Sequence, residues 1–455
     1  MNKEKLHIHL IGIGGVGMSA IAFILLDLGY KISGSDIIPS KITAKLVDKG
    51  ATFYKGHNKE NIQGANLVVV SSAIAETNPE IKEAKDKNVT IIKRAEMLSD
   101  IMNKKSGIAI AGTHGKTTTT SMVGLLLEKA GFDPTVIVGG EGNNIKGNAK
   151  FGLGEYIVAE ADESDGTFLK LNPHIAVITN IEDDHMEYYE KMENILKYFR
   201  KFSNKINDNG RVILCKDCKN VQKLLKNCRK NFITYGISEQ ADFMAKEIIF
   251  NKLSSKSKIY YKNKKMGELH LNIPGNHNIL NALASVVVAK EIGIDFKEIA
   301  EILRDFKGVK RRMEIVSDIN SEMLIIDDYA HHPTEIIATL SALRNSWKDR
   351  RLIAVFQPHR FTRTKLLAEK FGKAFFDANY VIVNDIYAAN EPPIAGISGE
   401  TIFNEIKKNN HKHVKYIPSK NNILRYLNKN VQPGDIVITM GAGDVWTISR
   451  ELAKQ

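Results

Sequence analysis

The chain has 455 residues, of which 43% are hydrophobic and 25% charged, a composition typical of globular proteins and unlike that of disordered, collagen-like or coiled-coil chains. Three cysteines are too few for a disulfide framework and fit a reducing compartment, so we expect a cytoplasmic protein. The net charge of +12 suits anionic small substrates as well as nucleic acid.

The first apolar stretch, Leu6 to Leu28, has the length of a membrane span but is interrupted by glycines and polar side chains. We predict a buried strand, a glycine turn and a helix there, and no membrane association.

From that point apolar strand-like segments alternate with longer amphipathic segments, which predicts βαβ units and parallel sheets. New strand-and-turn starts near residues 105 and 308 divide the chain into three α/β blocks. A Lys/Asn-rich stretch at 205–265 predicts a β-rich lobe on the second block.

The first motif, IGIGGVGMSA, carries Gly12, Gly14, Gly15 and Gly17 between a predicted strand and a predicted helix. Such glycines allow the backbone and the helix N-terminus to approach a pyrophosphate. Asp36 ends the next strand, where an acid that binds a ribose would stand. The motif by itself leaves three interpretations open: an NAD site, a sugar-nucleotide site, or a turn needed only for packing.

The second motif, AGTHGKTTTT, lies between another predicted strand and helix and resembles a phosphate-binding loop. It departs from the usual pattern because Ile110 stands where the first glycine is expected. The physical requirements are nevertheless present. Backbone N–H groups could surround phosphate, Lys116 could contact the β- and γ-phosphates, and Thr117 could bind Mg²⁺.

Acidic residues cluster after the predicted strand YIVAE. They are Glu160, Asp162, Glu163 and Asp165. Four carboxylates at one strand end repel one another unless a cation lies among them, so the cluster predicts a metal site. His185 follows another strand of the same block and is a candidate metal ligand. Together these residues predict a phosphoryl-transfer arrangement with bound metal.

Polar residues also follow the apolar strands of the third block, where ligands of α/β sheets gather. They are Arg311, Arg312, Asp327, Asp328, His331, His332, His359, Arg360 and Arg363. Arginines can hold carboxylate and phosphate groups bidentately, which favours a binding site over a solvated basic face. The pair Cys215 and Cys218 lacks the further ligands that a zinc site needs.

Eight motifs occur in the order in which the Mur ligases of peptidoglycan synthesis have them, and the chain most resembles the alanine-adding members of that family. The motifs are GIGGVGMS, AGTHGKTT, AEADESD, NIEDDHMEYY, PGNHNILNALA, GVKRRME, DDYAHHPTEI and QPHRFTRT. The resemblance implies an α/β fold of three domains. These are an N-terminal Rossmann-like domain that binds a UDP-sugar (1–104), a central P-loop ATPase domain with an extra β lobe (105–308), and a C-terminal Rossmann-like domain that closes over ATP and the amino acid (309–455).

The resemblance also implies substrates and cofactors: a monomer or homodimer would use ATP and Mg²⁺ to join L-alanine to UDP-N-acetylmuramate. The implied ATP contacts are Gly112, Thr113, His114, Gly115, Lys116, Thr117, Thr118, Asn276, His277, Asn278, Asn281, Arg312 and Asp328. The implied UDP-sugar contacts are Gly12, Gly14, Gly15, Gly17, Asp36, Ser71 and Ser72. The implied metal ligands are Thr117, Glu160 and His185. The implied contacts of the amino acid and the acyl centre are Tyr329, His331, Arg360 and Arg363, with Lys116, His331 and Arg360 as catalytic residues.

A carboxylate oxygen is a poor leaving group, so the formation of an amide from a carboxylate requires activation. No cysteine stands in a motif, so we expect an acyl phosphate formed with the γ-phosphate of ATP, followed by attack of the amine, with His331 as candidate base. The alternatives are a ligase that adds a preformed peptide to the same UDP-sugar, an NAD-dependent oxidoreductase, a nucleic-acid-dependent ATPase and a nucleotide-binding switch. The oxidoreductase leaves AGTHGKTT unexplained. No basic run with interleaved aromatic residues supports a nucleic-acid partner, and we expect none.

Overall fold

The computed structural model describes residues 6–71, 73–144, 147–317 and 322–454. Its strands form three sheets, and the chain divides into two compact units. The first unit consists of Met1–Glu247, Ser257–Leu269 and Leu280–Phe306, and the second of Ile248–Lys256, His270–Ile279 and Lys307–Gln455. Within the described part of the chain, we find no helix with the length and hydropathy needed to span a bilayer.

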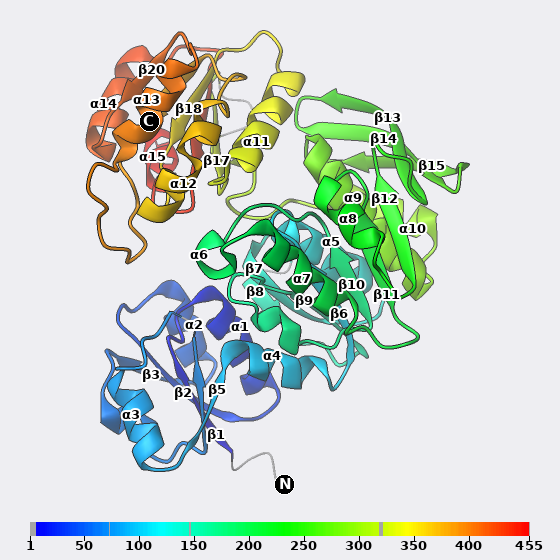
Figure 1. Cartoon of the computed structure of the whole chain (residues 1–455), viewed down its shortest axis with the longest axis vertical. Helices are drawn as coiled ribbons and strands as arrows, with labels where there is room; N and C mark the ends of the chain where they lie inside the picture. The colour runs from blue at the N-terminus through cyan, green and yellow to red at the C-terminus, as the bar shows by residue number, and fades with distance from the viewer. Residues whose placement is uncertain (1–5, 72, 145–146, 318–321, 455) are drawn as a thin grey trace. The chain divides into compact units, whose positions relative to one another are not determined.

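The first sheet has five parallel strands in the order β3-β2-β1-β4-β5 (Figure 1). The strands are β1 (His7–Ile11), β2 (Lys31–Asp36), β3 (Thr52–Lys55), β4 (Leu67–Val70) and β5 (Thr90–Lys93). The helices are α1 (Val16–Asp27), α2 (Lys41–Asp48), α3 (Pro79–Asp86) and α4 (Arg94–Met102), with a 3-10 turn η2 (Lys59–Ile62). Successive strand residues face opposite sides, so Leu10 joins the core that contains α1 whereas Ile11 joins the core that contains α3. The strand, glycine turn and helix predicted for Leu6 to Leu28 are confirmed.

The second sheet has ten strands in the order β15-β14-β13-β12-β11-β10-β6-β9-β7-β8. The strands are β6 (Ser106–Ala111), β7 (Thr135–Gly142), β8 (Gly147–Lys150), β9 (Tyr156–Glu160), β10 (Ile175–Ile178), β11 (Arg211–Cys215), β12 (Phe232–Gly236), β13 (Phe243–Asn251), β14 (Ser254–Tyr261) and β15 (Lys264–Leu271). The helices are α5 (Lys116–Lys129), α6 (Met186–Tyr189), α7 (Met192–Ser203), α8 (Lys219–Leu225), α9 (Asn276–Ile292) and α10 (Phe296–Arg304), with a 3-10 turn η3 (Thr167–Lys170). The strands of the Lys/Asn-rich stretch extend this same sheet.

The centre of the second sheet sets the position of the predicted site. Strand β6 pairs in parallel with β9 on one side and with β10 on the other. The carboxyl ends of these three strands therefore lie next to one another. As a result, the glycine turn after β6, the acids after β9 and the segment after β10 meet at one edge of the sheet.

The third sheet has six strands in the order β16-β17-β21-β18-β19-β20, and only the edge strand β16 is antiparallel to its neighbour. The strands are β16 (Glu314–Ile315), β17 (Leu324–Asp328), β18 (Leu352–Phe356), β19 (Tyr380–Val383), β20 (Val414–Tyr416) and β21 (Ile436–Met440). The helices are α11 (Pro333–Ser346), α12 (Phe361–Gly372), α13 (Gly399–Lys408), α14 (Lys420–Asn430) and α15 (Trp446–Leu452). Ile326 belongs to the core shared with α11, α12 and α13, whereas Ile325 belongs to the core shared with α14 and α15. The sheet is therefore covered by helices on both faces.

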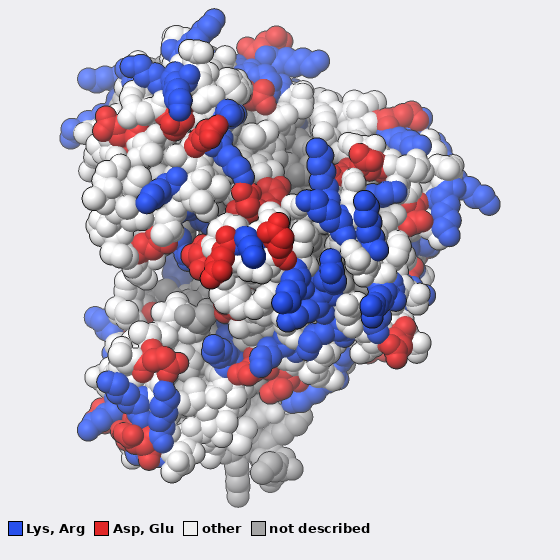
Figure 2. Space-filling view, viewed as in Figure 1, with Lys and Arg blue, Asp and Glu red and all other residues white. Residues whose placement is uncertain are grey.

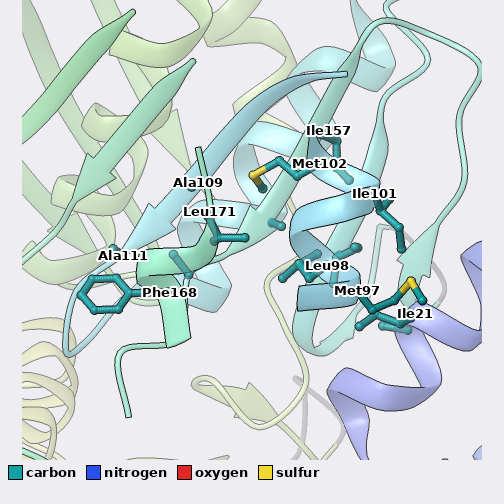
Figure 3. Close-up of a cluster of buried hydrophobic side chains, with 14 of the residues drawn as sticks. Ile21, Met97, Leu98, Ile101, Met102, Ala109, Ala111, Ile157, Phe168 and Leu171 are labelled. Atoms are coloured by element: carbon teal, nitrogen blue, oxygen red, sulfur yellow. The ribbon is translucent and has the colours of Figure 1, made fainter. Parts of the chain in front are cut away.

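Helix α4 connects the first two sheets within the first unit (Figure 3). Its side chains Met97, Leu98 and Ile101 lie in one hydrophobic cluster with Ile21 of α1 and Ile157 of β9. Burial of each such side chain contributes roughly 2 kcal/mol. Arg94, the first residue of α4, lies against Gly17 of the first glycine turn and forms an ion pair with Asp162 after β9.

On the face shown in Figure 2, lysine and arginine side chains are interspersed with acidic ones. Several of them form exposed ion pairs, such as Lys150 with Glu128 and Asp133. Each exposed pair contributes little to stability because solvent screens it.

The three sheets occupy residues 7–93, 106–271 and 314–440 and lie within the three blocks predicted from the sequence. The boundaries 1–104, 105–308 and 309–455 themselves stay predictions.

Candidate active site

The glycine turn of the first sheet is held by the strand next to it. Gly12 has a φ of +82° and its N–H donates to the Ser35 carbonyl at 2.8 Å. Gly14 donates its N–H to the Asp36 carboxylate at 2.9 Å. Asp36, predicted to contact a ribose, therefore also shapes the turn. Ser71, a predicted UDP-sugar contact, directly follows β4, whereas Ser72 lies outside the described residues.

A buried polar cluster lies at the same end of the first sheet, and the sequence analysis missed it. The fully buried carboxylate of Glu80 accepts hydrogen bonds from Ser35 Oγ at 2.7 Å and Asn61 Nδ2 at 2.6 Å, and His57 Nδ1 lies 3.0 Å away. Burial opposes ionisation of Glu80, but hydrogen bonds from His9, Ser35 and Asn61 outweigh it and hold the pKa of Glu80 below its ordinary value. The two histidines within the apolar strand HIHLI were the available signal.

The turn between β6 and α5, residues 112–115, is here called the phosphate loop. Gly112 and Gly115 have positive φ values of +127° and +83°. Thr113 donates its N–H to the Asn180 carbonyl at 3.2 Å, and His114 donates its N–H to Asn180 Oδ1 at 2.8 Å. Asn180, two residues beyond the end of β10, was not predicted as a site residue. Its backbone carbonyl and its side chain together hold the phosphate loop in place.

Helix α9 also contributes to the loop. A Cβ atom on Gly115 would lie 2.4 Å from Asn281 Oδ1, and Thr119 Oγ1 donates to the same oxygen at 3.3 Å. Asn281, predicted as an ATP contact, therefore lies against the phosphate loop. Asn278 instead donates its side-chain N–H to the Pro274 carbonyl at 2.7 Å.

Lys116 begins α5 and points back over the loop. Its ammonium donates to the Gly112 carbonyl at 2.6 Å and to both Glu163 carboxylate oxygens at 2.8 and 2.9 Å. Burial would lower the pKa of Lys116, but the carboxylates of Glu163, Asp162 and Glu160 raise it above its ordinary value. The ammonium is therefore charged and stands where a phosphate could reach it.

Two basic side chains balance the acids after β9. Glu163 pairs with Lys116, while Asp162 forms an ion pair with Arg94 at 3.2 Å. Burial would raise the pKa of Asp162, yet Lys116 and Arg94 lower it below its ordinary value. Glu160 accepts a hydrogen bond from the Gly139 N–H at 2.5 Å. The repulsion between carboxylates that the sequence predicted is therefore relieved by basic side chains of the protein. Arg94 was not predicted as a site residue.

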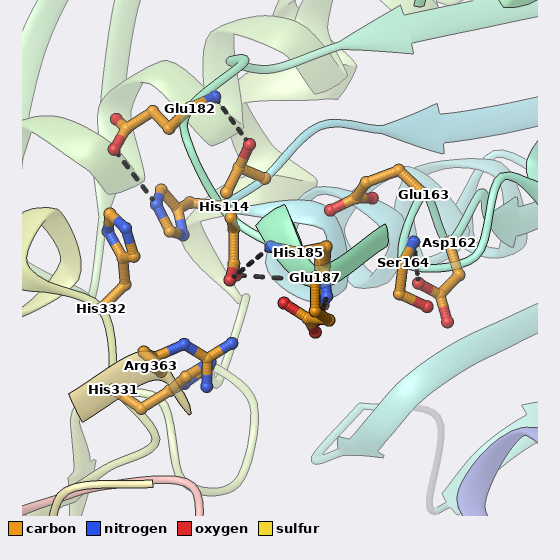
Figure 4. A network of polar contacts seen from close by, with 12 residues as sticks. His114, Asp162, Glu163, Ser164, Glu182, His185, Glu187, His331, His332 and Arg363 are labelled. Carbon is orange, nitrogen blue, oxygen red and sulfur yellow. Dashed lines mark hydrogen bonds and ion pairs between the residues drawn. The ribbon is translucent and has the colours of Figure 1, made fainter. Parts of the chain in front are cut away.

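His185 follows β10 and adopts a left-handed φ of +56°. Figure 4 shows its side chain together with those of Glu187 and Glu163. Its backbone N–H donates to Asp184 Oδ1 at 2.9 Å, and its ring Nδ1 lies 3.8 Å from Glu187 Oε1. Burial would lower the pKa of His185, but Glu187, Asp184 and Glu163 raise it. The ring therefore shares its electrostatic surroundings with Lys116 and Glu163.

The predicted metal ligands do not form a preassembled cluster. Among the described residues, neither Glu160 nor His185 belongs to a group of three His, Cys, Asp or Glu side chains with ligand atoms within 4.8 Å of one another. Thr117 is buried at the start of α5 and supplies a hydroxyl oxygen. The oxygen donors of Thr117 and Glu160 fit a hard divalent cation, and His185 adds a nitrogen donor.

The third sheet gathers its own set of polar residues at the carboxyl ends of its strands. The buried Asp328 carboxylate accepts hydrogen bonds from the N–H groups of Met313 at 2.8 Å and Ala330 at 2.7 Å. Burial raises the pKa of Asp328 to about 6, against the lowering effect of Arg312. Arg312 stacks over the Tyr329 ring, 4.9 Å from its centroid.

The neighbouring arginine has a structural role. Arg311 pairs with Asp327 at 3.1 Å and donates to the Gly441 carbonyl at 2.6 Å and the Gly443 carbonyl at 3.2 Å. It fixes the glycine turn after β21. Both arginines of GVKRRME lie over the Tyr329 ring, but Arg311 also holds this glycine turn, a difference that the sequence could not show.

His331 has the tautomer that a base requires. Its Nδ1 lies 2.9 Å from the Tyr329 carbonyl, which can only accept, so Nδ1 carries the proton of the neutral ring and Nε2 carries the lone pair. His359 has the opposite tautomer, because Arg363 Nη1 donates to its Nδ1 at 3.3 Å. Arg360 stands at the start of α12 with a left-handed φ of +69°.

The half-buried ring of His277 gives a pH-dependent prediction for stability. Burial lowers its pKa to about 4, with Glu335 raising it and Arg312 lowering it. The unfolded chain takes up a proton below a pH of about 6.5 and the folded chain does not, so the free energy of unfolding should fall as the pH drops from about 6.5 to 4, by up to about 3 kcal/mol.

We expect His277→Gln to reduce this loss, measured by thermal unfolding between pH 7.5 and 4.5. The raised pKa of Asp328 acts in the opposite direction, because its protonation stabilises the fold as the pH falls below about 6. Asp328 is present in both proteins, so it cancels in the comparison. Equal losses in the two proteins would contradict the assignment to His277.

Three family profiles match consecutive parts of the chain. "Mur ligase family, catalytic domain" matches residues 7–106, "Mur ligase middle domain" matches 110–289, and "Mur ligase, glutamate ligase domain" matches 311–443. The phosphate loop and its carboxylates lie in the second of the three sheets, within the region matched by the middle-domain profile. Together these matches establish that the chain belongs to the Mur ligase family. The resemblance inferred from the motifs and the three-domain α/β fold class are both confirmed.

Similar proteins cover the whole chain. It is 48% identical to the UDP-N-acetylmuramate–L-alanine ligase of Pelotomaculum thermopropionicum, with 100% of this chain and 98% of the relative covered. It is also 48% identical to the protein of the same name from Geotalea uraniireducens, with 98% and 97% covered. Among solved structures, the UDP-N-acetylmuramate–alanine ligase of Thermotoga maritima has a TM-score of 0.85 at 30% identity, with 99% and 98% covered. A murein peptide ligase from Psychrobacter arcticus has a TM-score of 0.72 at 26% identity, with 99% and 98% covered.

Proposed function

We propose that this protein joins L-alanine to the carboxylate of UDP-N-acetylmuramate at the expense of ATP, releasing ADP and phosphate. The observation that carries the proposal is the charged Lys116 ammonium, held over the glycines of the phosphate loop and surrounded by carboxylates. The alanine ligases that are 48% identical over the full chain support the choice of substrates. We place this activity in the cytoplasm, in a monomer or homodimer.

The proposed reaction has two steps. An oxygen of the substrate carboxylate attacks the γ-phosphorus of ATP, and ADP leaves, which gives an acyl phosphate. The amine of L-alanine then attacks the acyl carbon, loses a proton, and phosphate leaves with the electron pair of the broken C–O bond. His331 is the proposed acceptor of that proton through Nε2.

Mg²⁺ is the proposed cofactor, and Thr117, Glu160 and His185 would hold it. When bound with ATP, it would supply positive charge to the phosphate oxygens. Lys116 would act on the same oxygens, because a phosphate group at the loop competes with Glu163 for the ammonium.

Arg360, Arg363 and Tyr329 are proposed contacts of the amino acid. The glycine turn of the first sheet, with Asp36 and Ser71, is the proposed UDP-sugar site.

The test is ADP release from ATP with UDP-N-acetylmuramate and one acceptor at a time. L-Alanine is expected to support turnover, whereas a preformed tripeptide is expected to support little. Preference for the tripeptide would favour the peptide-adding alternative. Calorimetry with NAD and with UDP-N-acetylmuramate distinguishes the oxidoreductase, since we expect binding of the UDP-sugar and none of NAD.

A further inference from the structure

The segment that follows β18 carries His359, Arg360 and Arg363, and its backbone needs outside support. Arg360 has a left-handed φ of +69°, a conformation that disfavours any residue with a side chain. Arg360 is also the N-cap residue of α12, and its side chain makes no capping hydrogen bond. Such a conformation persists only where neighbouring structure holds it in place.

The support comes from a loop between β19 and α13, residues 384–398. Glu391 on this loop accepts hydrogen bonds from the Thr362 N–H at 3.0 Å and from Thr362 Oγ1 at 2.7 Å. Its carboxylate therefore caps α12 in place of the side chain of Arg360, and the same carboxylate lies 3.9 Å from the Arg360 guanidinium.

Tyr387 on the same loop holds the segment at its centre. Its N–H donates to the Pro358 carbonyl at 2.9 Å, and its own carbonyl accepts the Arg360 N–H at 2.9 Å. Its ring stacks on His359, with centroids 5.6 Å apart and planes 8° apart. The Tyr387 backbone therefore sets the position of the segment, and the Tyr387 ring sets the plane of His359.

The plane of His359 determines where its N–H points. Because Arg363 donates to Nδ1, the neutral ring presents Nε2–H as a donor. The His359 ring also lies 5.9 Å from the ring of His331 in an edge-on arrangement. An imidazole N–H beside the Arg363 guanidinium is suited to bind the carboxylate of an amino acid.

We propose that Tyr387 is a positioning residue for the L-alanine subsite, acting by stacking on His359 and thereby orienting its Nε2–H and the Arg363 guanidinium toward the amino-acid carboxylate. The inference rests on the proposed function. Tyr387 itself need not touch the substrate, and the ring rather than the hydroxyl is the active feature.

The test compares steady-state kinetics for three substrates in four variants. Tyr387→Ala and Tyr387→Leu are expected to raise KM for L-alanine by about 2- to 10-fold, the range that corresponds to loss of an aromatic pair. KM for ATP and for UDP-N-acetylmuramate should stay within about twofold by the same reasoning. Tyr387→Phe, which keeps the flat ring, should restore KM for L-alanine to near the wild-type value.

The matched control is Tyr380→Ala. Tyr380 also stacks on a histidine, His413, with centroids 4.6 Å apart, but it lies at the opposite end of β19. Its removal should leave KM for L-alanine unchanged. If the wild-type protein shows no alanine-dependent ADP release, the proposed function fails. If the wild type is active but Tyr387→Ala and Tyr387→Leu leave KM for L-alanine unchanged, or raise all three KM values equally, the inference about Tyr387 is wrong.

Discussion

Replacing Lys116 by alanine is expected to lower ATP-dependent ligation by roughly 1000-fold, the upper range for removal of one charge-stabilising donor. The ammonium contacts both the Gly112 carbonyl and the Glu163 carboxylate, so the substitution removes a positive charge that lies against the phosphate loop. ADP release with saturating substrates measures the effect. Near-normal release would remove the phosphate loop from the proposed mechanism.

The same substitution should affect stability in a way that separates the two roles of Lys116. Glu163 has a side chain only 4% exposed, so Lys116→Ala leaves a buried carboxylate without its cation, at a cost of about 3 kcal/mol. The double variant Lys116→Ala/Glu163→Gln should recover much of the thermal stability but none of the activity. Lys105→Ala is the control. Lys105 donates to the carbonyls of Gly152 and Gly154 outside the proposed site, so its loss should leave turnover intact.

Replacing Gly112 by alanine is expected to lower turnover by about 100-fold or more, because small displacements of a reacting group have effects of that size. A Cβ atom at this position would lie 2.2 Å from Thr179 Oγ1 and 2.9 Å from the Asn180 carbonyl oxygen. The Asn180 backbone also accepts the Thr113 N–H, so it cannot move without displacing the loop. The loop must therefore shift, and with it the carbonyl that Lys116 contacts.

Gly131→Ala serves as the control for backbone strain. Gly131 has a φ of +83° just after α5, and a Cβ atom there would have no neighbour within 4 Å. This variant should lose only the roughly 1 kcal/mol of a left-handed alanine and keep full activity. Gly112→Ala should be less stable than this control by about 1–3 kcal/mol, the usual cost of overpacking. Equal stability and activity of the two variants would show that the close approach at Gly112 does not matter.

Much of the fold could be predicted because its signals are local. A continuous apolar strand followed by a glycine turn and a helix is visible within about 20 residues, which identified β1 with α1 and β6 with α5. Strands at the edges gave weaker signals. The two-residue β16 and the three-residue β20 are half-exposed, so their side chains show no apolar run. The sequence analysis did not identify either of them.

The candidate site likewise has one part with a local sequence signal and another part that depends on contacts between distant residues. The position of Lys116 at a strand-to-helix turn was determined by the sequence alone, because turn chemistry depends on adjacent residues. Its partner Glu163 is 47 residues away, and Arg94 lies 68 residues from Asp162. These pairs depend on the strand order and on the packing of α4, neither of which leaves a local trace.

Tertiary structure alone also decided which residues of a motif are structural. In GVKRRME the adjacent Arg311 and Arg312 look equivalent, yet only Arg311 is committed to the carbonyls of Gly441 and Gly443, about 130 residues further along the chain. Tyr387 stands in no recognised motif and gains its importance from parallel pairing that places its loop beside His359. The sequence by itself therefore determined the family and the strand ends that bear the candidate site. The partners that charge-balance and orient those residues were decided by contacts between distant segments, which form only when the sheets assemble.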